Sequence, residues 1–412
     1  MIALRIFAAA IEDSAMNIDH RNTAKVPGRI AGLGAGCLAA LLVTATAAAD
    51  SRDQAKRIHD RLAGVPPTAS VLADMAADIQ AGNALAAAET AMQNRAFYDV
   101  TLKNFATPWT NRDQTVFAPL NDYSATVIGM VRDDVPFNTA LSANLVYVSN
   151  ASGLPAYSAT SNAHYEQAES RGVDLQATLV ARQQSDLLGL PAEATAGLIT
   201  TRASSEAFFI DGTNRAMFRF TLMNHLCHDL EQVQDTTLPP DRIRQDVSRS
   251  PGGDSRVFLN NCIGCHTGMD PMTQAFAYYD FDETQQRLVY TAGAPNAKYF
   301  VNAENFKPGY VTPDDHWDNY WRKGHNRLLG WGWGTTATSG SGAGAKSLGE
   351  ELANSEAFAT CQVQKVFKAV CFRAPQDSTD RAKVAQIAAS FRGSNYRLKT
   401  VFAETAAYCM GQ

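Results

Sequence analysis

The residues Cys262-Ile263-Gly264-Cys265-His266 have the types and the spacing that attach a c-type haem. Each cysteine can form a thioether with one haem vinyl group, and the histidine after the second cysteine can bind the iron as its proximal ligand. A zinc half-site and a dithiol redox pair are the alternatives. A zinc site would need a second Cys/His pair at ligand spacing, and a thioredoxin-like pair would need a βαβ setting. The flanking sequence offers neither, so we expect one covalently bound haem c, with His266 as the iron ligand.

The ligand on the opposite side of the iron separates two kinds of function. A Met or His sixth ligand is typical of an electron carrier, whereas an open position permits chemistry on a substrate or on O₂. Met269 and Met272 are too close in sequence to His266 to reach the other haem face. For any single candidate further away, a structural or surface role is the common alternative. These candidate ligands are His225, His228, His316, His325, Met223 and Met410.

The first 49 residues have the pattern of a secretory signal peptide. Arg21, Lys25 and Arg29 precede an uncharged run over residues 30–49, which offers small-residue cleavage sites after Ala47 or Ala49. An uncleaved anchor is the alternative, because the run is long enough to span a bilayer. Its many Gly, Ala and Thr residues favour cleavage. We expect a periplasmic or secreted bacterial protein with no membrane span after signal removal.

Four further cysteines follow the expected signal peptide: Cys227, Cys361, Cys371 and Cys409. An even number in an oxidising compartment predicts two disulfides. If residues 361–371 form one helix, its two cysteines lie ~15 Å apart by helical rise, which is too far to bridge. Two connectivities then remain open.

The composition of the 412 residues is that of a globular protein, with 45% hydrophobic and 19% charged residues. The net charge of -5 gives no basic footprint for nucleic acid. Apolar residues recur at helical spacing and no region is rich in strands, which predicts a mainly α, multi-helical haem protein with long loops and little or no sheet. We expect helices over 50–63, 70–104, 120–131, 213–232 and 271–279, with two or three more over 347–409. Asp270 would cap the helix that begins at Pro271.

Five regions are expected along the chain. Residues 1–49 form the signal peptide, 50–195 an N-terminal helical region, 196–310 the haem-binding region, 311–345 a Trp-rich and Gly/Ser-rich loop, and 346–412 a C-terminal helical region. Core packing is the default role for the tryptophans of the fourth region, with haem shielding or electron exit as the alternative. They are Trp317, Trp321, Trp331 and Trp333.

Sequence blocks on both sides of the motif add to this interpretation. They are Gly197-Leu198-Ile199-Thr200, Leu226-Cys227, Met269-Asp270-Pro271, Tyr279-Asp280 and Leu352-Ala353-Asn354-Ser355 through Cys361. Together they resemble the secreted planctomycete-type cytochrome c family, whose members carry DUF1592, DUF1588 and DUF1585 domains. The resemblance places these domains in the later part of 50–195, in 196–310 and in 346–412.

The chain also departs from the family pattern. Thr273 and Ala277 stand where the family often has Gly and Glu, and Cys371 is an addition. Because Cys371 is additional, the resemblance implies Cys371–Cys409 as one disulfide and Cys227–Cys361 as the other.

Three functions are compatible with these expectations. The first is one-electron transfer in the periplasm or at the cell surface, with a redox protein or a quinone-linked donor or acceptor as partner. The second is an oxidase-like or peroxidase-like haem enzyme with an open distal site and an extracytoplasmic substrate. The third is a non-catalytic module of a surface complex. The single Cys-x-x-Cys-His motif disfavours a dihaem peroxidase.

Overall fold

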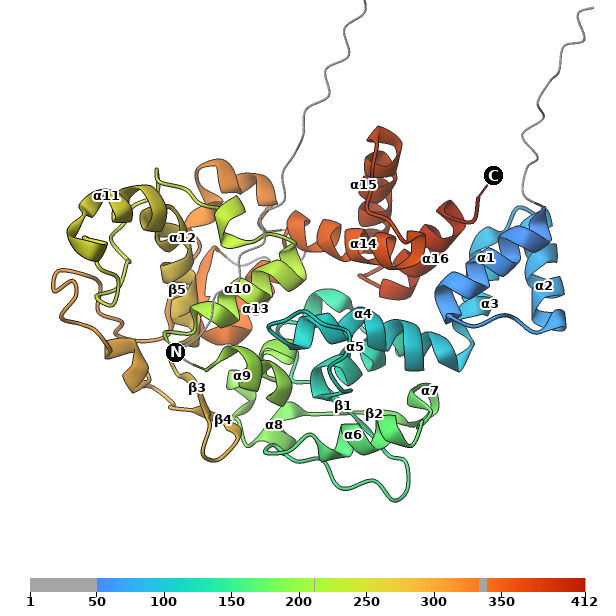
Figure 1. The fold of residues 1–412 in the computed structure, drawn as a ribbon, viewed down its shortest axis with the longest axis horizontal. Helices are drawn as coiled ribbons and strands as arrows, with labels where there is room; N and C mark the ends of the chain where they lie inside the picture. The colour runs from blue at the N-terminus through green and yellow to red at the C-terminus, as the bar shows by residue number, and fades with distance from the viewer. Residues whose placement is uncertain (1–49, 211, 333–338, 412) are drawn as a thin grey trace, which may run out of the picture. The chain divides into compact units, whose positions relative to one another are not determined.

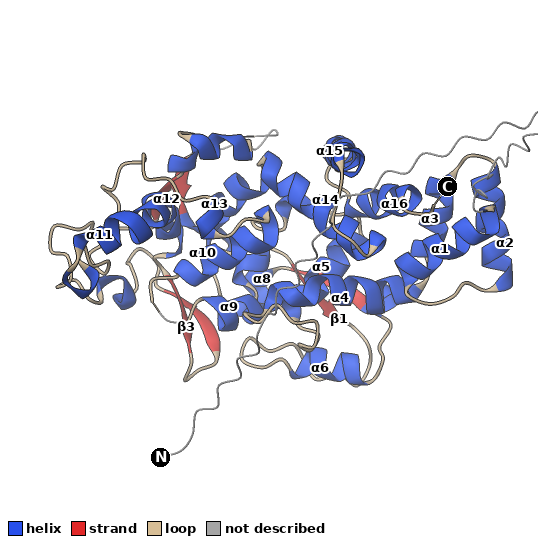
Figure 2. Cartoon of the chain, turned by 45° about the horizontal axis from the view of Figure 1, so that its top comes forward, coloured by secondary structure: helices blue, strands red, loops and turns tan. Residues whose placement is uncertain are grey.

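Helices make up most of the computed structural model, which describes residues 50–210, 212–332 and 339–411 (Figures 1 and 2). The mainly α fold expected from the sequence is confirmed. The expected signal peptide, Trp333 and residues 334–338 lie outside the described residues. No described helix is long and apolar enough to cross a membrane.

The described N-terminal part holds eight α-helices, five of which begin at a residue whose side chain caps the helix. The Asp50 carboxylate accepts hydrogen bonds from the amides of Arg52 and Asp53 and so begins α1, and Gly64 ends it at φ 73°. The single helical stretch expected over 70–104 is interrupted at Gly82 and Asn83, where the Asn83 side chain caps the next helix. The helices are α1 (Ser51–Ala63), α2 (Ala69–Gln80), α3 (Ala84–Met92), α4 (Lys103–Ala106), α5 (Asp122–Arg132), α6 (Ala163–Ser170), α7 (Leu175–Thr178) and α8 (Gln184–Leu188).

The middle of the chain is more irregular. The helix expected over 213–232 is shorter: α10 continues into a π-helical turn over Leu222–Leu226 and stops at Cys227, whose φ is 57°. A second π-helical turn, Phe258–Cys262, leads into α12. The helices here are α9 (Arg202–Phe208), α10 (Arg215–Thr221), α11 (Ser255–Val257) and α12 (Ile263–Thr273).

The prediction that a helix begins at Pro271 is wrong. α12 starts at Ile263 and carries Pro271 inside its last turn, so Asp270 is a helical residue and not a cap. The local capping rule fails because Asp270 is held by tertiary partners, described below. Beyond α12 the chain makes a 3₁₀ turn, Gln274–Phe276, and then enters a strand.

The C-terminal part folds into four helices, one more than the upper number expected. Ser355 and Asp377 cap the two longest of them with their side chains. The helices are α13 (Gly344–Ala353), α14 (Glu356–Cys371), α15 (Ser378–Gly393) and α16 (Leu398–Tyr408). The stretch expected as a loop up to residue 345 therefore includes the start of α13.

Three small antiparallel sheets of two strands each fasten segments together among the described residues. The first pairs β1 (Val146–Ser149) with β2 (Leu179–Arg182), the second is the hairpin of β3 (Tyr279–Asp282) and β4 (Arg287–Tyr290), and the third pairs β5 (His316–Asp318) with β6 (Ser341–Ala343). In the third sheet Trp317 lies opposite Gly342, so this sheet ties the Trp-rich segment to the start of α13.

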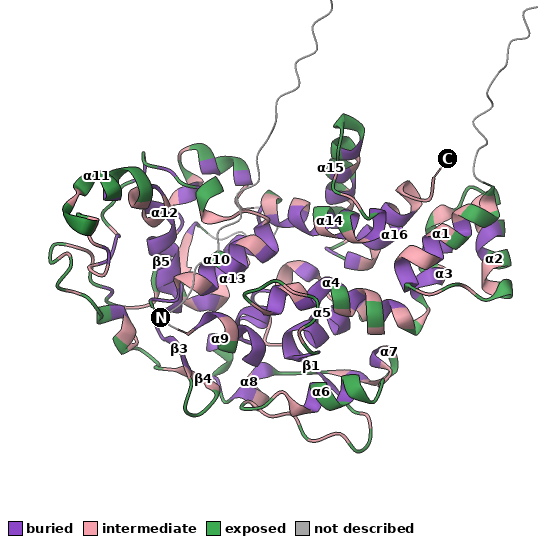
Figure 3. Ribbon diagram, in the orientation of Figure 1, coloured by how far each residue is buried: buried purple, intermediate pink, exposed green. Residues whose placement is uncertain are grey.

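One main hydrophobic core extends from Ala55 to Ala406 and draws on all four regions expected after residue 49. Figure 3 shows its buried residues on α5, α10, α12, α13 and α14. Trp317 and Trp321 are completely buried in it, which is the packing role expected as the default for the tryptophans.

Two disulfides link segments that lie far apart in the sequence. The structure joins Cys227 to Cys361, with Cα atoms 5.3 Å apart, and Cys371 to Cys409, with Cα atoms 5.6 Å apart. This is the pairing that the family resemblance implies. Cys361 and Cys371 both lie in α14, and Cys371 is its last residue.

Removing either disulfide should lower the free energy of unfolding. Chain entropy gives about 4 kcal/mol for Cys371→Ser/Cys409→Ser and about 1 kcal/mol more for Cys227→Ser/Cys361→Ser. The loss is larger for the second pair because its disulfide closes a loop of 134 residues, whereas the first closes a loop of 38 residues. Urea unfolding followed by circular dichroism measures both losses, and wild-type stability in either double variant would contradict the assigned pair.

Candidate haem-attachment site

The motif residues share one face of a helix. Cys262 directly precedes α12, and Cys265 and His266 follow three and four residues later, a spacing that places side chains next to each other on a helix surface. All three side chains are half-exposed, whereas Gly264 and the residues from Thr267 to Thr273 are buried. The helix is thus anchored by one side and presents the motif on the other.

One anchor of α12 is the segment that follows Asp229. The Asp235 amide donates to the Gly264 carbonyl at 2.8 Å, and the Thr267 hydroxyl donates to the Asp235 carbonyl at 2.8 Å. The Cys265 sulfur lies 3.6 Å from the Leu230 carbonyl oxygen. These contacts fix the turn of helix that carries the second cysteine.

The other anchor is Trp321. A Cβ atom placed on Gly268 would lie 1.9 Å from the Trp321 Nε1 atom, so the indole occupies the space that a side chain at 268 would need. Trp321 also packs on Phe218 and on Trp331, with ring centroids 5.7 and 6.5 Å apart. The Trp cluster therefore supports the back of the motif helix.

His266 is held by a buried carboxylate one turn further along α12. Its Nδ1 atom lies 3.1 Å from Oδ1 of Asp270, whose side chain has no solvent exposure. Arg215 donates from Nε and Nη2 to the two Asp270 oxygens, at 2.8 and 3.0 Å, and from Nη1 and Nη2 to the two oxygens of Asp246. Arg244 lies 3.8 Å from Asp270.

These charges determine the protonation of the pair. Burial alone would raise the pKa of Asp270, but the opposing positive charges, Arg215 foremost, hold that pKa well below its usual range. An ionised carboxylate only accepts hydrogen bonds, so the proton between the two groups sits on Nδ1 of His266. The described residues make no hydrogen bond to Nε2. In the neutral ring the Nε2 lone pair is therefore available to a metal, as a histidine ligand requires.

Apolar groups surround the first cysteine. Cys262 and Ile263 pack against a small cluster of Ile243, Val247 and Phe258. Val257 and Leu259, just before the motif, expose 37% and 53% of their surface, and Figure 3 shows this exposed region around α11. Leu259 lies one helical turn before Cys262, where it could contact an apolar macrocycle held beside that cysteine.

Cys262 and Cys265 are the two free cysteines among the described residues. Burial raises the pKa of the Cys265 thiol, so it stays protonated at neutral pH. Thioether attachment to vinyl groups consumes free thiols, which both residues supply.

The described side chains do not converge in the way that a zinc site requires. A zinc ion needs its ligand atoms to converge within about 2.0–2.3 Å of one point. Among residues 50–210, 212–332 and 339–411, no group of three or more His, Cys, Asp or Glu side chains does so. Haem attachment imposes no such convergence, because the thioethers form at the macrocycle edge and the histidine binds at its centre. The residues present fit the haem interpretation.

His225 lies in the core. Its Nε2 atom lies 2.7 Å from the Tyr123 hydroxyl, and its ring contacts Trp109 and Phe358. Burial holds the pKa of His225 well below its usual value, so it is neutral.

Two other candidate ligands lie beside the segment that anchors α12. His325 is exposed and its Nδ1 is 3.3 Å from the Asp235 carboxylate. His228 has its Nδ1 2.7 Å from the Leu226 carbonyl oxygen. Both line one cleft of about 440 Å³, together with Leu328, which is 80% exposed.

The remaining three candidates have other surroundings. His316 is exposed on β5 and lies 3.8 Å from Asp318. Met223 packs at the edge of the main core, and the Met410 carbonyl accepts a hydrogen bond from Arg57 on α1. The structure thus places His228 and His325 in one cleft, which neither the other four candidates nor the motif residues line.

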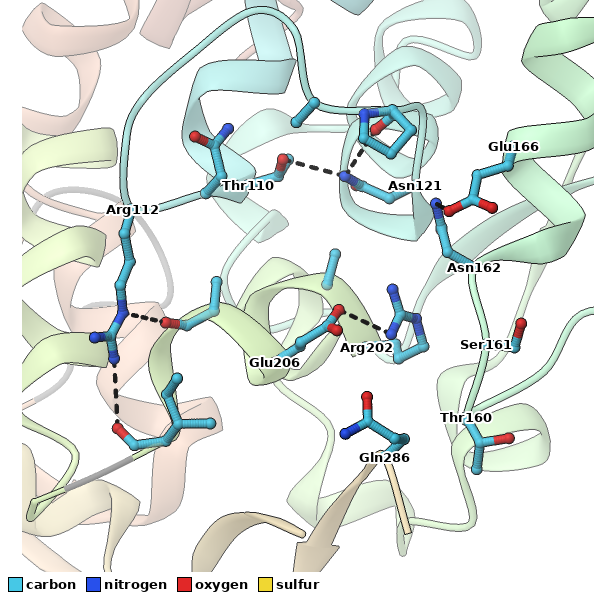
Figure 4. Close-up of a pocket in the computed structure, with 16 residues that line it drawn as sticks. Thr110, Arg112, Asn121, Thr160, Ser161, Asn162, Glu166, Arg202, Glu206 and Gln286 are labelled. Carbon is cyan, nitrogen blue, oxygen red and sulfur yellow. Dashed lines mark hydrogen bonds and ion pairs between the residues drawn. The ribbon is translucent and has the colours of Figure 1, made fainter. Parts of the chain in front are cut away.

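A second cleft, of about 550 Å³, lies away from the motif (Figure 4). Amide and hydroxyl side chains line it, among them Asn121 and Asn162, and Arg202 in its wall forms an ion pair with Glu206 at 2.9 Å. None of the motif residues or candidate ligands lines this cleft.

The sequence alone did not reveal the charged cluster behind His266. The cluster includes residues that lie 20–51 positions before His266 in the sequence, and their spacing does not indicate that they meet. They are Arg215, Arg244 and Asp246. Asp270 carried a usable signal, because a carboxylate four residues after a histidine lies next to it on a helix.

Comparison with protein-family models, with curated proteins and with solved structures finds no match. The family resemblance stays a prediction that rests on the residues quoted for it.

The fit of Trp321 against Gly268 is testable. Gly268→Ala should lower the free energy of unfolding by about 1–3 kcal/mol, because the added methyl group forces the buried indole to move. Gly393→Ala is the matched control: no heavy atom lies within 4 Å of a Cβ there, and alanine suits a helix. Urea unfolding compares the two, and equal stabilities would rule out the tight contact.

Proposed function

We propose that this protein is an exported monohaem c-type cytochrome that transfers single electrons in the periplasm or at the cell surface. Cys262 and Cys265 hold the haem through thioethers, and Nε2 of His266 is the proximal ligand. The observation that carries the proposal is the His266–Asp270 pair, which directs the proton to Nδ1 and leaves Nε2 available on the exposed face of α12. When bound, the haem supplies an Fe(III)/Fe(II) couple.

The chain's own residues position and shield this group. The contacts of Asp235 and Trp321 fix α12, so the two thiols and the imidazole keep one relative orientation. Val257 and Leu259 give the macrocycle apolar contact surface. A rigid scaffold suits electron transfer, because it limits the reorganisation that accompanies a change in iron charge.

The two disulfides support an oxidising location outside the cytoplasm. Together with the signal-like N-terminus they favour the periplasm or the cell exterior. The partner is then a redox protein or a quinone-linked donor or acceptor.

The cleft lined by His228 and His325 gives a second candidate function. If one of these histidines binds the iron, the protein is a carrier. If no side chain does, the site is open and an oxidase-like or peroxidase-like activity follows. We propose the carrier, with the sixth ligand drawn from this pair.

Haem attachment is tested first. The exported wild-type chain should contain one covalent haem in a pyridine haemochrome assay, and Cys262→Ser/Cys265→Ser should contain none. His316→Ala, an exposed residue on β5, is the control and should keep the haem. A wild-type chain without covalent haem contradicts the proposed function.

Optical and electron paramagnetic resonance spectra then test the sixth ligand. The ferric wild type should be low-spin without a methionine-sulfur charge-transfer band. His228→Ala or His325→Ala should become high-spin, while His316→Ala stays low-spin. A high-spin wild type that shifts with cyanide would favour the open-site enzyme, and a methionine band would move the ligand to Met223 or Met410.

A further inference from the structure

The carboxylate of Asp270 lies buried behind the imidazole ring of His266. Three features set it apart from an ordinary helix ion pair: the Asp270 side chain has no solvent exposure, it faces two guanidinium groups, and it contacts the residue assigned as proximal ligand. An ion pair at positions i and i+4 on an exposed helix surface is screened by water and contributes little. This one is shielded from solvent, so water screens the interaction of the carboxylate with the imidazole less than it would on an exposed surface.

The arginines keep the carboxylate charged without removing its effect on His266. Arg215 shares its guanidinium between Asp270 and Asp246, with contacts of 2.6–3.0 Å to the four oxygens. Arg244 is also shared, since it donates to the hydroxyls of Thr213 and Thr273 and lies over the Tyr299 ring. Oδ1 of Asp270 thus remains an anionic acceptor for Nδ1–H of His266.

A histidine ligand that donates its second N–H to a carboxylate becomes more basic, because negative charge moves onto the ring. A more basic ligand stabilises the higher charge of the ferric iron over the ferrous iron. The usual alternative partner, a backbone carbonyl, carries no net charge and has a weaker effect.

We infer that Asp270 is a positioning residue that fixes the His266 ring and makes it a strongly donating ligand, which lowers the reduction potential of the haem. The inference rests on the proposed function, since it requires His266 to be the proximal ligand. It assigns Arg215 a supporting part, as the group that allows the anion to be buried.

The test compares two isosteric changes within one charge cluster of the haem-loaded protein. Asp270→Asn removes the charge in contact with His266, and Asp246→Asn removes an equal charge from the other side of Arg215. The measurements are the midpoint potential and the iron–histidine stretching frequency of the ferrous haem, recorded by resonance Raman scattering after photolysis of bound CO.

Asp270→Asn should favour reduction by about tenfold or more, which is about 59 mV for a one-electron couple, and should lower the iron–histidine frequency. Asp246→Asn should leave that frequency unchanged and alter the potential less. Equal frequencies in wild type and Asp270→Asn would overturn the inference while leaving the proposed function intact. A wild type without haem overturns both.

A second measurement covers the case in which Asp270→Asn does not fold. The wild-type iron–histidine frequency should exceed that of a c-type haem protein whose proximal histidine donates to a backbone carbonyl. An equal or lower frequency would show that Asp270 does not strengthen the ligand.

Discussion

The ion pair of Arg215 and Asp270 is the constraint around which the segments beside α12 are arranged. A carboxylate without solvent contact is costly unless opposite charges and hydrogen bonds surround it. Here α10 supplies Arg215, the segment before α11 supplies Arg244 and Asp246, and α12 supplies Asp270 itself. Segments with little regular structure of their own are therefore drawn onto the motif helix. The same carboxylate contacts His266, so the interaction that assembles these segments also orients the imidazole ring of the motif.

Side-chain caps and apolar spacing predicted the helices whose ends depend only on neighbouring residues. The boundaries of α1 and α5 follow from caps and apolar spacing, and the structure agrees closely with the expected ranges. The start of α12 could not be predicted in this way. Asp-Pro is a favourable helix start in isolation, but the Asp270 side chain forms stronger bonds with Arg215 than a cap would provide. The helix instead begins before the second cysteine and tolerates Pro271 in its final turn.

The candidate site, too, could be predicted only where it depends on residues close together in the sequence. The motif identified Cys262, Cys265 and His266 from spacing alone, but the six candidate ligands could not be ranked, since their surroundings depend on distant segments. His225 and His228 illustrate this. They are three residues apart, yet the π-helical turn and the left-handed backbone at Cys227 end the helix between them. One histidine enters the core against Tyr123, and the other lines a cleft with His325. Likewise, spacing left two disulfide connectivities open.

The disulfide between Cys227 and Cys361 has a consequence for how the chain matures. It spans 134 residues and encloses the motif, whose own two thiols are only three positions apart. Short loops close with less entropy loss than long ones, so in an unfolded chain Cys262 and Cys265 meet each other long before Cys227 meets Cys361. An oxidising environment thus makes the wrong pair first. On the proposed function, in which both thiols hold a haem, thiol exchange must return that pair to the reduced state before attachment, so maturation of the protein requires a reductant as well as an oxidant.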